Sequence, residues 1–255
     1  MNEPIVPHVS ALYRYPVKGL TPERLEEAHV APGKTLPGDR VYAIENGPGR
    51  FNPDEPKHLP KINFLMLMRN ERLATLDTHF DDDTNVLTIL RNGRQVARGQ
   101  ISTKLGRSMI EQFLAAYMKA DLRGAPHIVV SPGHNFTDVA QKCVHIVNQS
   151  SVRELERVSG RAINPLRFRP NILIEGLPIW SELDLLGKSF TIGSVRLDVF
   201  QRTQRCDATN VEPATGERDM AIPALLQRTL GHTDFGIYAT VASPGTIKPG
   251  DHVSL

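Results

Sequence analysis

Turn-forming residues divide the chain into short apolar runs, and this division restricts the fold more than any other feature of the sequence. Glycine and proline each occur 19 times among the 255 residues. Residues 9–15 and 189–200 alternate apolar and polar side chains, which is typical of a half-buried β-strand. Because many such short runs are separated by turns, we predict an α+β fold that is predominantly β.

The same pattern places the other elements along the chain. Residues 108–119 and 220–230 carry apolar side chains at helical spacing, so both are predicted helices. Residues 46–60 are rich in glycine and proline and are predicted to form a loop. Predicted strands are the apolar runs at residues 41–44, 63–69, 74–79, 86–90, 126–131, 144–147, 172–174, 236–241 and 252–255. We expect an N-terminal β-rich domain over residues 1–120 and a second domain over residues 121–255.

Charge and cysteine content argue against several classes of protein. The formal net charge is +2 at pH 7, so an extended basic surface for nucleic acid is not expected. Cys143 and Cys206 are too few and too far apart to suggest a disulfide scaffold, a zinc site or an iron–sulfur cluster. The N-terminus lacks the basic and apolar regions of a signal peptide, and no apolar run reaches the roughly 20 residues of a membrane span. We expect a cytoplasmic protein without a membrane span.

Cys206 lies in the most informative polar segment, residues 201–219. Arg202 and Arg205 precede the cysteine, and a turn signal at residues 212–216 follows it. Neighbouring positive charge favours the thiolate, which is both the better nucleophile and the better ligand for a soft metal. Alternatively, Cys206 is a small core residue at the end of a strand, as free cysteines often are. The residues alone leave both interpretations open.

Two arginines lie two positions apart within residues 167–171, just before a predicted strand. On extended chain, Arg167 and Arg169 share a face, and their forked N–H groups suit phosphate or the carbonyl groups of a pterin. The alternative is a buried ion pair, although no acidic residue is adjacent in the sequence. Lys18, in the loop after Pro16, can act as a mobile point charge for phosphate, or it is a solvated surface lysine.

A third helix is predicted to begin within Asn148-Gln149-Ser150-Ser151. Ser150 or Ser151 is the predicted N-cap, and Glu154 would complete a capping box with Ser151. A helix N-terminus exposes free N–H groups and partial positive charge, so the same turn can bind phosphate. The two roles are compatible.

Several of these segments resemble the MOSC proteins, which are named for the C-terminal domain of molybdenum cofactor sulfurase. The resemblance is carried by residues 167–172, 235–238 and 244–251, and by Arg205, Cys206, Thr209, Val211, Pro213, Thr215 and Gly216 of the cysteine segment. Residues 15–19 and 38–40 resemble the β-barrel domain that often precedes MOSC. The segments follow one another in the right order over nearly the whole chain. This implies a MOSC-type β-barrel with an N-terminal β-rich domain.

The resemblance implies a molybdenum–molybdopterin cofactor with Cys206 as the ligand to the metal. In relatives with this N-terminal domain, the lysine that matches Lys18 is close to the cofactor's phosphate, and a Ser/Thr-rich turn lies against the cofactor. The cofactor-binding residues implied for this sequence are Lys18, Arg40, Asn148, Ser150, Ser151, Arg167, Arg169, Asn171, Arg205 and Cys206. For Arg40 the alternative is a salt bridge with a nearby carboxylate.

Asp207 is the second catalytic candidate, beside Cys206. Its carboxylate could donate a proton near the metal, or could disfavour the thiolate of the cysteine. Amidoxime-reducing members of the family have an apolar residue at this place, so Asp207 leaves the substrate class open.

The function implied by the resemblance is a molybdenum-dependent oxidoreductase that needs no pyridoxal phosphate. In the mitochondrial amidoxime-reducing component, a MOSC protein, such a centre reduces N-hydroxylated compounds by two-electron removal of oxygen. Because residue 255 is not followed by a cysteine-rich ferredoxin extension, we expect electrons from a separate donor protein: a ferredoxin, a cytochrome b5-like protein or a flavin reductase. One alternative is a sulfur or cofactor carrier in which Cys206 holds a persulfide without turnover. Another is a non-catalytic barrel in which Cys206 is structural.

Overall fold

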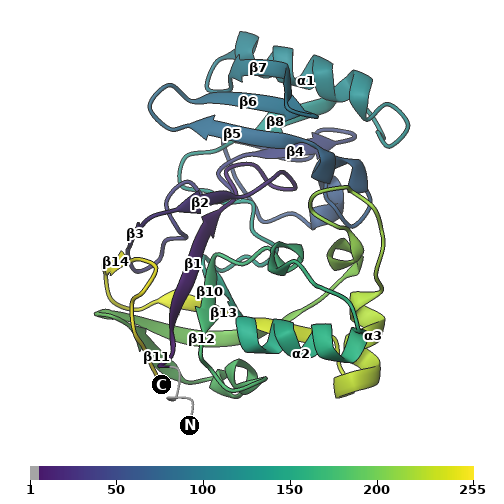
Figure 1. Cartoon of the computed structure of the whole chain (residues 1–255). Helices are drawn as coiled ribbons and strands as arrows, with labels where there is room; N and C mark the ends of the chain where they lie inside the picture. The colour runs from purple at the N-terminus through teal and green to yellow at the C-terminus, as the bar shows by residue number, and fades with distance from the viewer. Residues whose placement is uncertain (1–5) are drawn as a thin grey trace.

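A curled sheet of eight strands forms one part of the protein, in a computed structural model that describes residues 6–255 (Figure 1). The strand order is β15-β11-β12-β13-β9-β10-β1-β2, and all neighbours are antiparallel except β9 and β10. The strands are β1 (His8–Arg14), β2 (Glu23–Leu25), β9 (Val144–Asn148), β10 (Ile172–Glu175), β11 (Ser189–Ile192), β12 (Val195–Gln204), β13 (Asp234–Val241) and β15 (Val253–Ser254).

Smaller sheets and one helix form the other part, at the top of Figure 1. A three-stranded sheet consists of β5 (Asp77–Asp81), β6 (Val86–Arg91) and β7 (Arg94–Gln100), and α1 (Lys104–Tyr117) contacts β7. Beside it, β4 (Ala43–Asn46) pairs with β8 (Pro126–Val129). A further pair, β3 (Ala28–Val30) with β14 (Gly245–Ile247), lies beside the large sheet, and its buried side chains enter a core of that sheet. The predominantly β fold class is thereby confirmed, with three α-helices among the described residues.

The alternating strands of the large sheet supply two separate cores. On β10, Ile172 and Ile174 enter one core, and Leu173 enters the other. The second core is covered by α2 (Gln149–Ser159), which joins β9 to β10, and by α3 (Ile222–Leu230), which precedes β13. This is the outcome expected when side chains of period two point to opposite faces of a sheet that is packed on both sides.

The two parts share strands across the predicted boundary at residue 120. β1 belongs to the large sheet, whereas β8 pairs with β4 of the upper part. The chain also forms short 3₁₀ helices: η1 (Lys61–Asn63), η2 (Glu71–Thr75), η3 (Pro165–Phe168), η4 (Ser181–Leu185) and η5 (Asp207–Asn210). The division into residues 1–120 and 121–255 stays a prediction.

Three strand predictions were wrong in part or in full. Residues 63–69 form no strand: Asn63 ends η1, Phe64 makes a single bridge to Glu45, and residues 67–69 form a turn. Close to this turn, the side chain of Asn70 accepts a hydrogen bond from the Met66 backbone N–H at 3.0 Å. Residues 74–79 begin in η2, so the strand β5 starts only at Asp77. Residues 189–200 are two strands, which are separated by a turn at Gly193 with a φ of 55°.

The cap predicted for the third helix was also wrong. Asn148 is the N-cap of α2, and its side chain accepts a hydrogen bond from the Ser150 N–H at 3.0 Å. The Ser151 hydroxyl instead donates a hydrogen bond to Glu182, and Glu154 accepts a hydrogen bond from Arg157, so no capping box forms. A side chain that can reach either the helix end or a buried acceptor is drawn to the buried acceptor, where an unmade hydrogen bond is most costly. Within residues 6–255, no helix combines the length and apolarity that a bilayer crossing requires.

Candidate functional site

A cavity of about 80 Å³ lies between the two parts of the protein. Its walls come from widely separated segments: the loop after β1, η1, the turn after η1, the loops before β9 and β10, the end of β12 and the middle of β13. Its charged lining residues are Lys18, Arg40, Lys61, Asp138, Arg167, Arg169 and Arg205, and Cys206 lies among them. Small-molecule sites are usually ~300–1,000 Å³, so this cavity is smaller than a cofactor-sized ligand requires.

Cys206 reaches this cavity because β12 ends two residues before it. The residue stays extended and precedes η5, where the Thr209 N–H and hydroxyl both donate to its carbonyl oxygen, at 3.0 and 2.9 Å. Its half-buried sulfur accepts a hydrogen bond from Nζ of Lys61 at 3.3 Å. Lys61 lies in η1, 145 residues earlier in the chain, and no local sequence signal links the two residues.

Lys18 is buried at another wall of the cavity. Its ammonium donates to the Phe136 carbonyl at 2.9 Å and forms an ion pair with Asp138 at 2.5 Å. Burial lowers the pKa of Lys18, and Asp138 opposes this effect. Burial also disfavours the charge of Asp138, but the ammonium groups of Lys18 and Lys61 outweigh it and hold the pKa of that carboxyl well below its usual range. Sequence reasoning missed Asp138, whose only signal was a polar loop.

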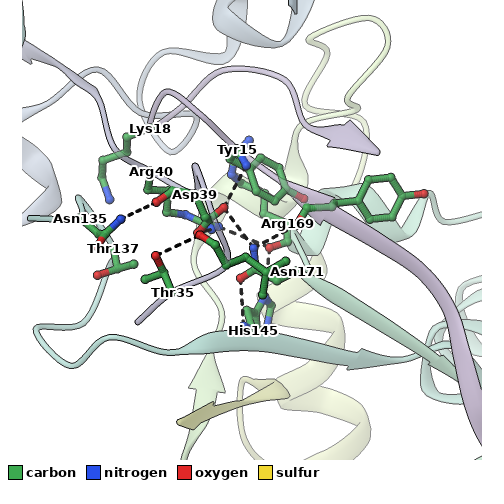
Figure 2. A network of polar contacts seen from close by, with 12 residues as sticks. Tyr15, Lys18, Thr35, Asp39, Arg40, Asn135, Thr137, His145, Arg169 and Asn171 are labelled. Atoms are coloured by element: carbon green, nitrogen blue, oxygen red, sulfur yellow. Dashed lines mark hydrogen bonds and ion pairs between the residues drawn. The ribbon is translucent and has the colours of Figure 1, made fainter. Parts of the chain in front are cut away.

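Arg40 and Arg169 both lie over the ring of Tyr15 (Figure 2). Their guanidinium carbons are 4.6 and 4.0 Å from the ring centroid. Both residues have a left-handed backbone, with φ of 50° and 53°, a strained conformation that often marks functional sites. Asp39 forms an ion pair with Arg40, whose pKa rises because this attraction outweighs burial.

Arg169 is less well compensated than Arg40. Its Nη1 donates to the Leu20 carbonyl at 2.8 Å, but its buried Nη2 has no hydrogen-bond partner within residues 6–255. Burial lowers the pKa of Arg169 to about 10. An unsatisfied buried N–H donor is rare in a native protein and calls for an explanation, such as a ligand.

Arg205 and His145 form a third polar contact at the cavity. Nη2 of Arg205 donates to the Phe168 carbonyl at 2.8 Å, and its buried Nε lacks a partner among the described residues. Burial, followed by the charge of Arg205, places the pKa of His145 well below its usual range. His145 is therefore neutral: Nδ1–H donates to the Arg169 carbonyl at 3.1 Å, and Nε2 faces Arg205 at 3.4 Å. This geometry gives His145 a positioning role that the sequence did not reveal.

Asn171 and Arg167 take part in the supporting structure. The side-chain amide of Asn171 donates to the carboxylate of Asp39 at 3.1 Å, and its oxygen accepts from the backbone N–H of His145 at 3.0 Å (Figure 2). Arg167 touches the cavity, yet it is bound by ion pairs to Glu212 and to Asp219, the latter at 2.7 Å. The buried ion pair weighed for Arg167 is thus present, and its acids come from more than 40 residues away.

The other predicted residues do not line this cavity. Asn148 and Ser151 are buried against Glu182, at 2.9 and 3.0 Å from the same carboxyl oxygen, and Ser150 lies beside them. Asp207 is exposed, and its carboxylate accepts from Asn210 at 3.2 Å. The structure therefore brings together Lys18, Arg40, Arg167, Arg169, Arg205 and Cys206, and leaves Asn148, Ser150, Ser151, Asn171 and Asp207 outside.

Comparisons with known proteins agree with the arrangement of the chain. The MOSC N-terminal beta barrel domain matches residues 6–123, and the MOSC domain matches residues 124–254. The human mitochondrial amidoxime-reducing component 1 is 24% identical over 281 residues, which cover 97% of this chain and 82% of that protein.

A second protein matches part of the sequence, and a solved structure overlaps with the fold. The molybdenum cofactor sulfurase of Drosophila persimilis is 34% identical over 110 residues, but these cover only 43% of this chain and 14% of the sulfurase. The crystal structure of the YUAD protein from Bacillus subtilis overlaps with 98% of this chain and 94% of its own, at 12% identity and a TM-score of 0.46. Because the MOSC domain alone matches more than half of the sequence, the chain belongs to the MOSC family.

Proposed function

We propose that this protein binds a molybdenum–molybdopterin cofactor and is an oxidoreductase that reduces N-hydroxylated compounds. The observation that carries the proposal is the charge of the cavity. Six cationic side chains and one carboxylate line it beside Cys206. Arg169 and Arg205 each keep a buried N–H donor without a partner within residues 6–255. Such a surplus of donors and positive charge suits a phosphorylated ligand with acceptor groups.

The residues fit the proposed cofactor in their chemistry. Lys18, Arg40 and Arg169 would hold its phosphate or pterin oxygens, and the sulfur of Cys206 is a ligand type that soft metals favour. No cluster of three or more His, Cys, Asp or Glu side chains in residues 6–255 could hold a metal by itself. Cys206 would then be the protein's ligand to a metal that the cofactor otherwise coordinates.

The protein's own contribution is binding and orientation. When bound, the cofactor would supply the two-electron chemistry that removes oxygen from an N–OH group. Neutral His145 and the ring of Tyr15 fix the positions of Arg205, Arg40 and Arg169. The relative named for amidoxime reduction matches over both halves of the chain, and this supports the oxidoreductase proposal. Electrons would come from a separate donor protein.

A sulfur or cofactor carrier is the second candidate. It is favoured by the molybdenum cofactor sulfurase of Drosophila persimilis, which is 34% identical over 110 residues, whereas the human amidoxime-reducing relative is 24% identical over 281 residues. In a carrier, the accessible sulfur of Cys206 would hold a persulfide and no substrate would be reduced.

Elemental and pterin analysis of protein from a molybdenum-replete host tests the proposal. We expect close to one molybdenum and one pterin per chain, and reduction of benzamidoxime with an artificial electron donor. In Cys206→Ala, molybdenum should fall at least tenfold while the melting temperature stays within about 2 °C. Unchanged molybdenum in Cys206→Ala would refute the ligand role, and cyanolysable sulfur without benzamidoxime reduction would establish the carrier instead.

A further inference from the structure

Lys61 brings a positive charge to Cys206 from the other part of the molecule. Its Nζ is 3.3 Å from the sulfur, and its half-buried side chain lines the cavity. The Lys61 ammonium donates its hydrogen bond to the sulfur of Cys206, and no carboxylate within residues 6–255 forms an ion pair with Lys61. A lysine in this setting is a point charge on a flexible stem without a carboxylate in direct contact.

The surroundings of the sulfur do not cancel this charge. Arg205, the residue before Cys206, adds a second cation to the same wall. Within the described chain, Asp138 is the one carboxylate of the cavity lining; its direct ion pair is with Lys18, and Lys61 acts on it only at longer range. The space beside the sulfur is therefore positive even before the deeper cations Arg40 and Arg169 are counted.

We propose that Lys61 is a specificity-determining residue that makes the reacting space beside Cys206 selective for anionic small molecules. Under the proposed function, the favoured substrates are N-hydroxylated compounds that carry a carboxylate, and this identification of the substrate rests on that function. The charge preference itself does not, because it follows from the position of Lys61 relative to the sulfur. The ammonium group stays within reach of any molecule that approaches the sulfur, since four methylene groups allow it to turn.

The charge preference can be measured with two alkylating reagents of similar size. Iodoacetate is an anion and iodoacetamide is neutral, and each loses iodide as the sulfur forms its new bond to carbon. The ratio of their rates at Cys206 reports the charge of the surroundings, because the fraction of reactive thiolate is common to both. The full chain is produced in a host that makes no molybdopterin, and peptide mass mapping separates Cys206 from Cys143, which is buried and whose pKa burial raises to about 12.

Four variants make the measurement decisive. Lys61→Gln should lower the iodoacetate to iodoacetamide ratio about three- to tenfold, the effect of one charge a few ångströms away in a partly solvated cavity. Lys61→Glu should lower it further, and Lys61→Arg should restore it. Lys57→Gln is the matched control, since Lys57 lies in the loop just before η1 but is exposed and paired with Glu55 at 2.8 Å. Equal ratios in wild type, Lys61→Gln and Lys61→Glu would overturn the proposal.

Substrate kinetics give a second, separable test on the cofactor-loaded protein. A carboxylated benzamidoxime should have a higher kcat/KM than benzamidoxime in the wild type, and Lys61→Glu should reverse this order. If neither compound is reduced, the proposed function fails while the alkylation ratio still decides the charge preference. If both are reduced equally by wild type and by Lys61→Glu, the selectivity assigned to Lys61 is wrong and the oxidoreductase function stands.

Discussion

The residues around Cys206 and the start of α2 are both predicted from the sequence to bind an anion. In the part of the chain that the structure describes, the first region keeps unpaired donors, whereas the second is hydrogen-bonded by groups of the protein itself. In the cavity, Arg169 and Arg205 retain buried N–H donors without partners in the described chain. At the start of α2, the side chain of Asn148 caps the helix, and the carboxyl group of Glu182 takes hydrogen bonds from Asn148 and Ser151.

This difference shows when a helix start is available to a ligand. Free N–H groups and partial positive charge attract an anion only if no group of the same protein reaches them first. In α2, Asn148 accepts the Ser150 backbone N–H, and Glu182 of η4 accepts from the side chains of Asn148 and Ser151, so groups of the protein itself fill this place. Around Cys206, the cations outnumber the carboxylates, and a ligand would complete the site.

The largest expected difference between the two regions is a change in the free energy of unfolding with pH, which Glu182 causes. Burial raises the pKa of its carboxyl group to about 7 from the ordinary 4.5, against the hydrogen bonds from Asn148 and Ser151. Between these values the folded state holds a proton that the unfolded state releases, so stability falls as the pH rises from about 4.5 to about 7. The shift corresponds to about 3 kcal/mol in the free energy of unfolding.

Glu182→Gln isolates this contribution, because its side chain stays neutral at every pH. We expect urea unfolding at pH 5 and pH 8 to show a loss of stability in the wild type that is smaller in Glu182→Gln by up to about 3 kcal/mol. Parallel pH profiles for the two proteins would show that Glu182 is ionised in the folded state. The interpretation that its neutral carboxyl group fills the start of α2 would then be wrong.

The next effect is expected at Arg169, in the open region. Arg169→Gln should weaken cofactor retention at least tenfold, about 1.4 kcal/mol, because a charged donor to the ligand is lost. The melting temperature should not fall, since the buried charge that is removed has an unpaired Nη2 in the free protein. Molybdenum content after dialysis measures the first effect, and thermal unfolding of cofactor-free protein measures the second.

Arg153→Ala is the matched control for Arg169→Gln. Arg153 lies on α2, where it is half-exposed and pairs with Glu175. Its removal should leave molybdenum content unchanged, because it belongs to the region that the protein closes by itself. Equal loss of molybdenum in both variants would place the cofactor at the helix start after all.

Much of the fold could be predicted from the sequence because its signals are local. The alternation in residues 9–15 and the helical spacing in residues 108–119 are confirmed as β1 and α1, although α1 begins at Lys104. Residues 63–69 failed because an apolar run is also compatible with buried turns. There, the backbone N–H of Met66 donates to the side chain of Asn70, which lies outside the run.

The candidate site was less predictable, because its contacts join distant segments. The role of Arg167 depends on Glu212 and Asp219, and the surroundings of Cys206 depend on Lys61 in η1. Neither pair is marked by spacing in the sequence. Residue types suggested which side chains could bind an anion, but only the fold shows which of them are already neutralised by the protein.

The last comparison concerns two neighbouring serines at the start of α2, and the second of them has the smallest expected effect. Ser151→Ala removes the hydroxyl that donates to Glu182 at 3.0 Å and accepts from the backbone N–H of Trp180 at 2.9 Å. The free energy of unfolding should therefore fall by about 1–3 kcal/mol. Ser150→Ala should change this free energy by less than about 0.5 kcal/mol, because its hydroxyl accepts a long hydrogen bond of 3.3 Å from the exposed Arg153. Cofactor retention should be the same in both variants and in the wild type. A Ser150→Ala variant that loses molybdenum without losing stability would show that this turn binds the cofactor and that Glu182 yields its place to the ligand.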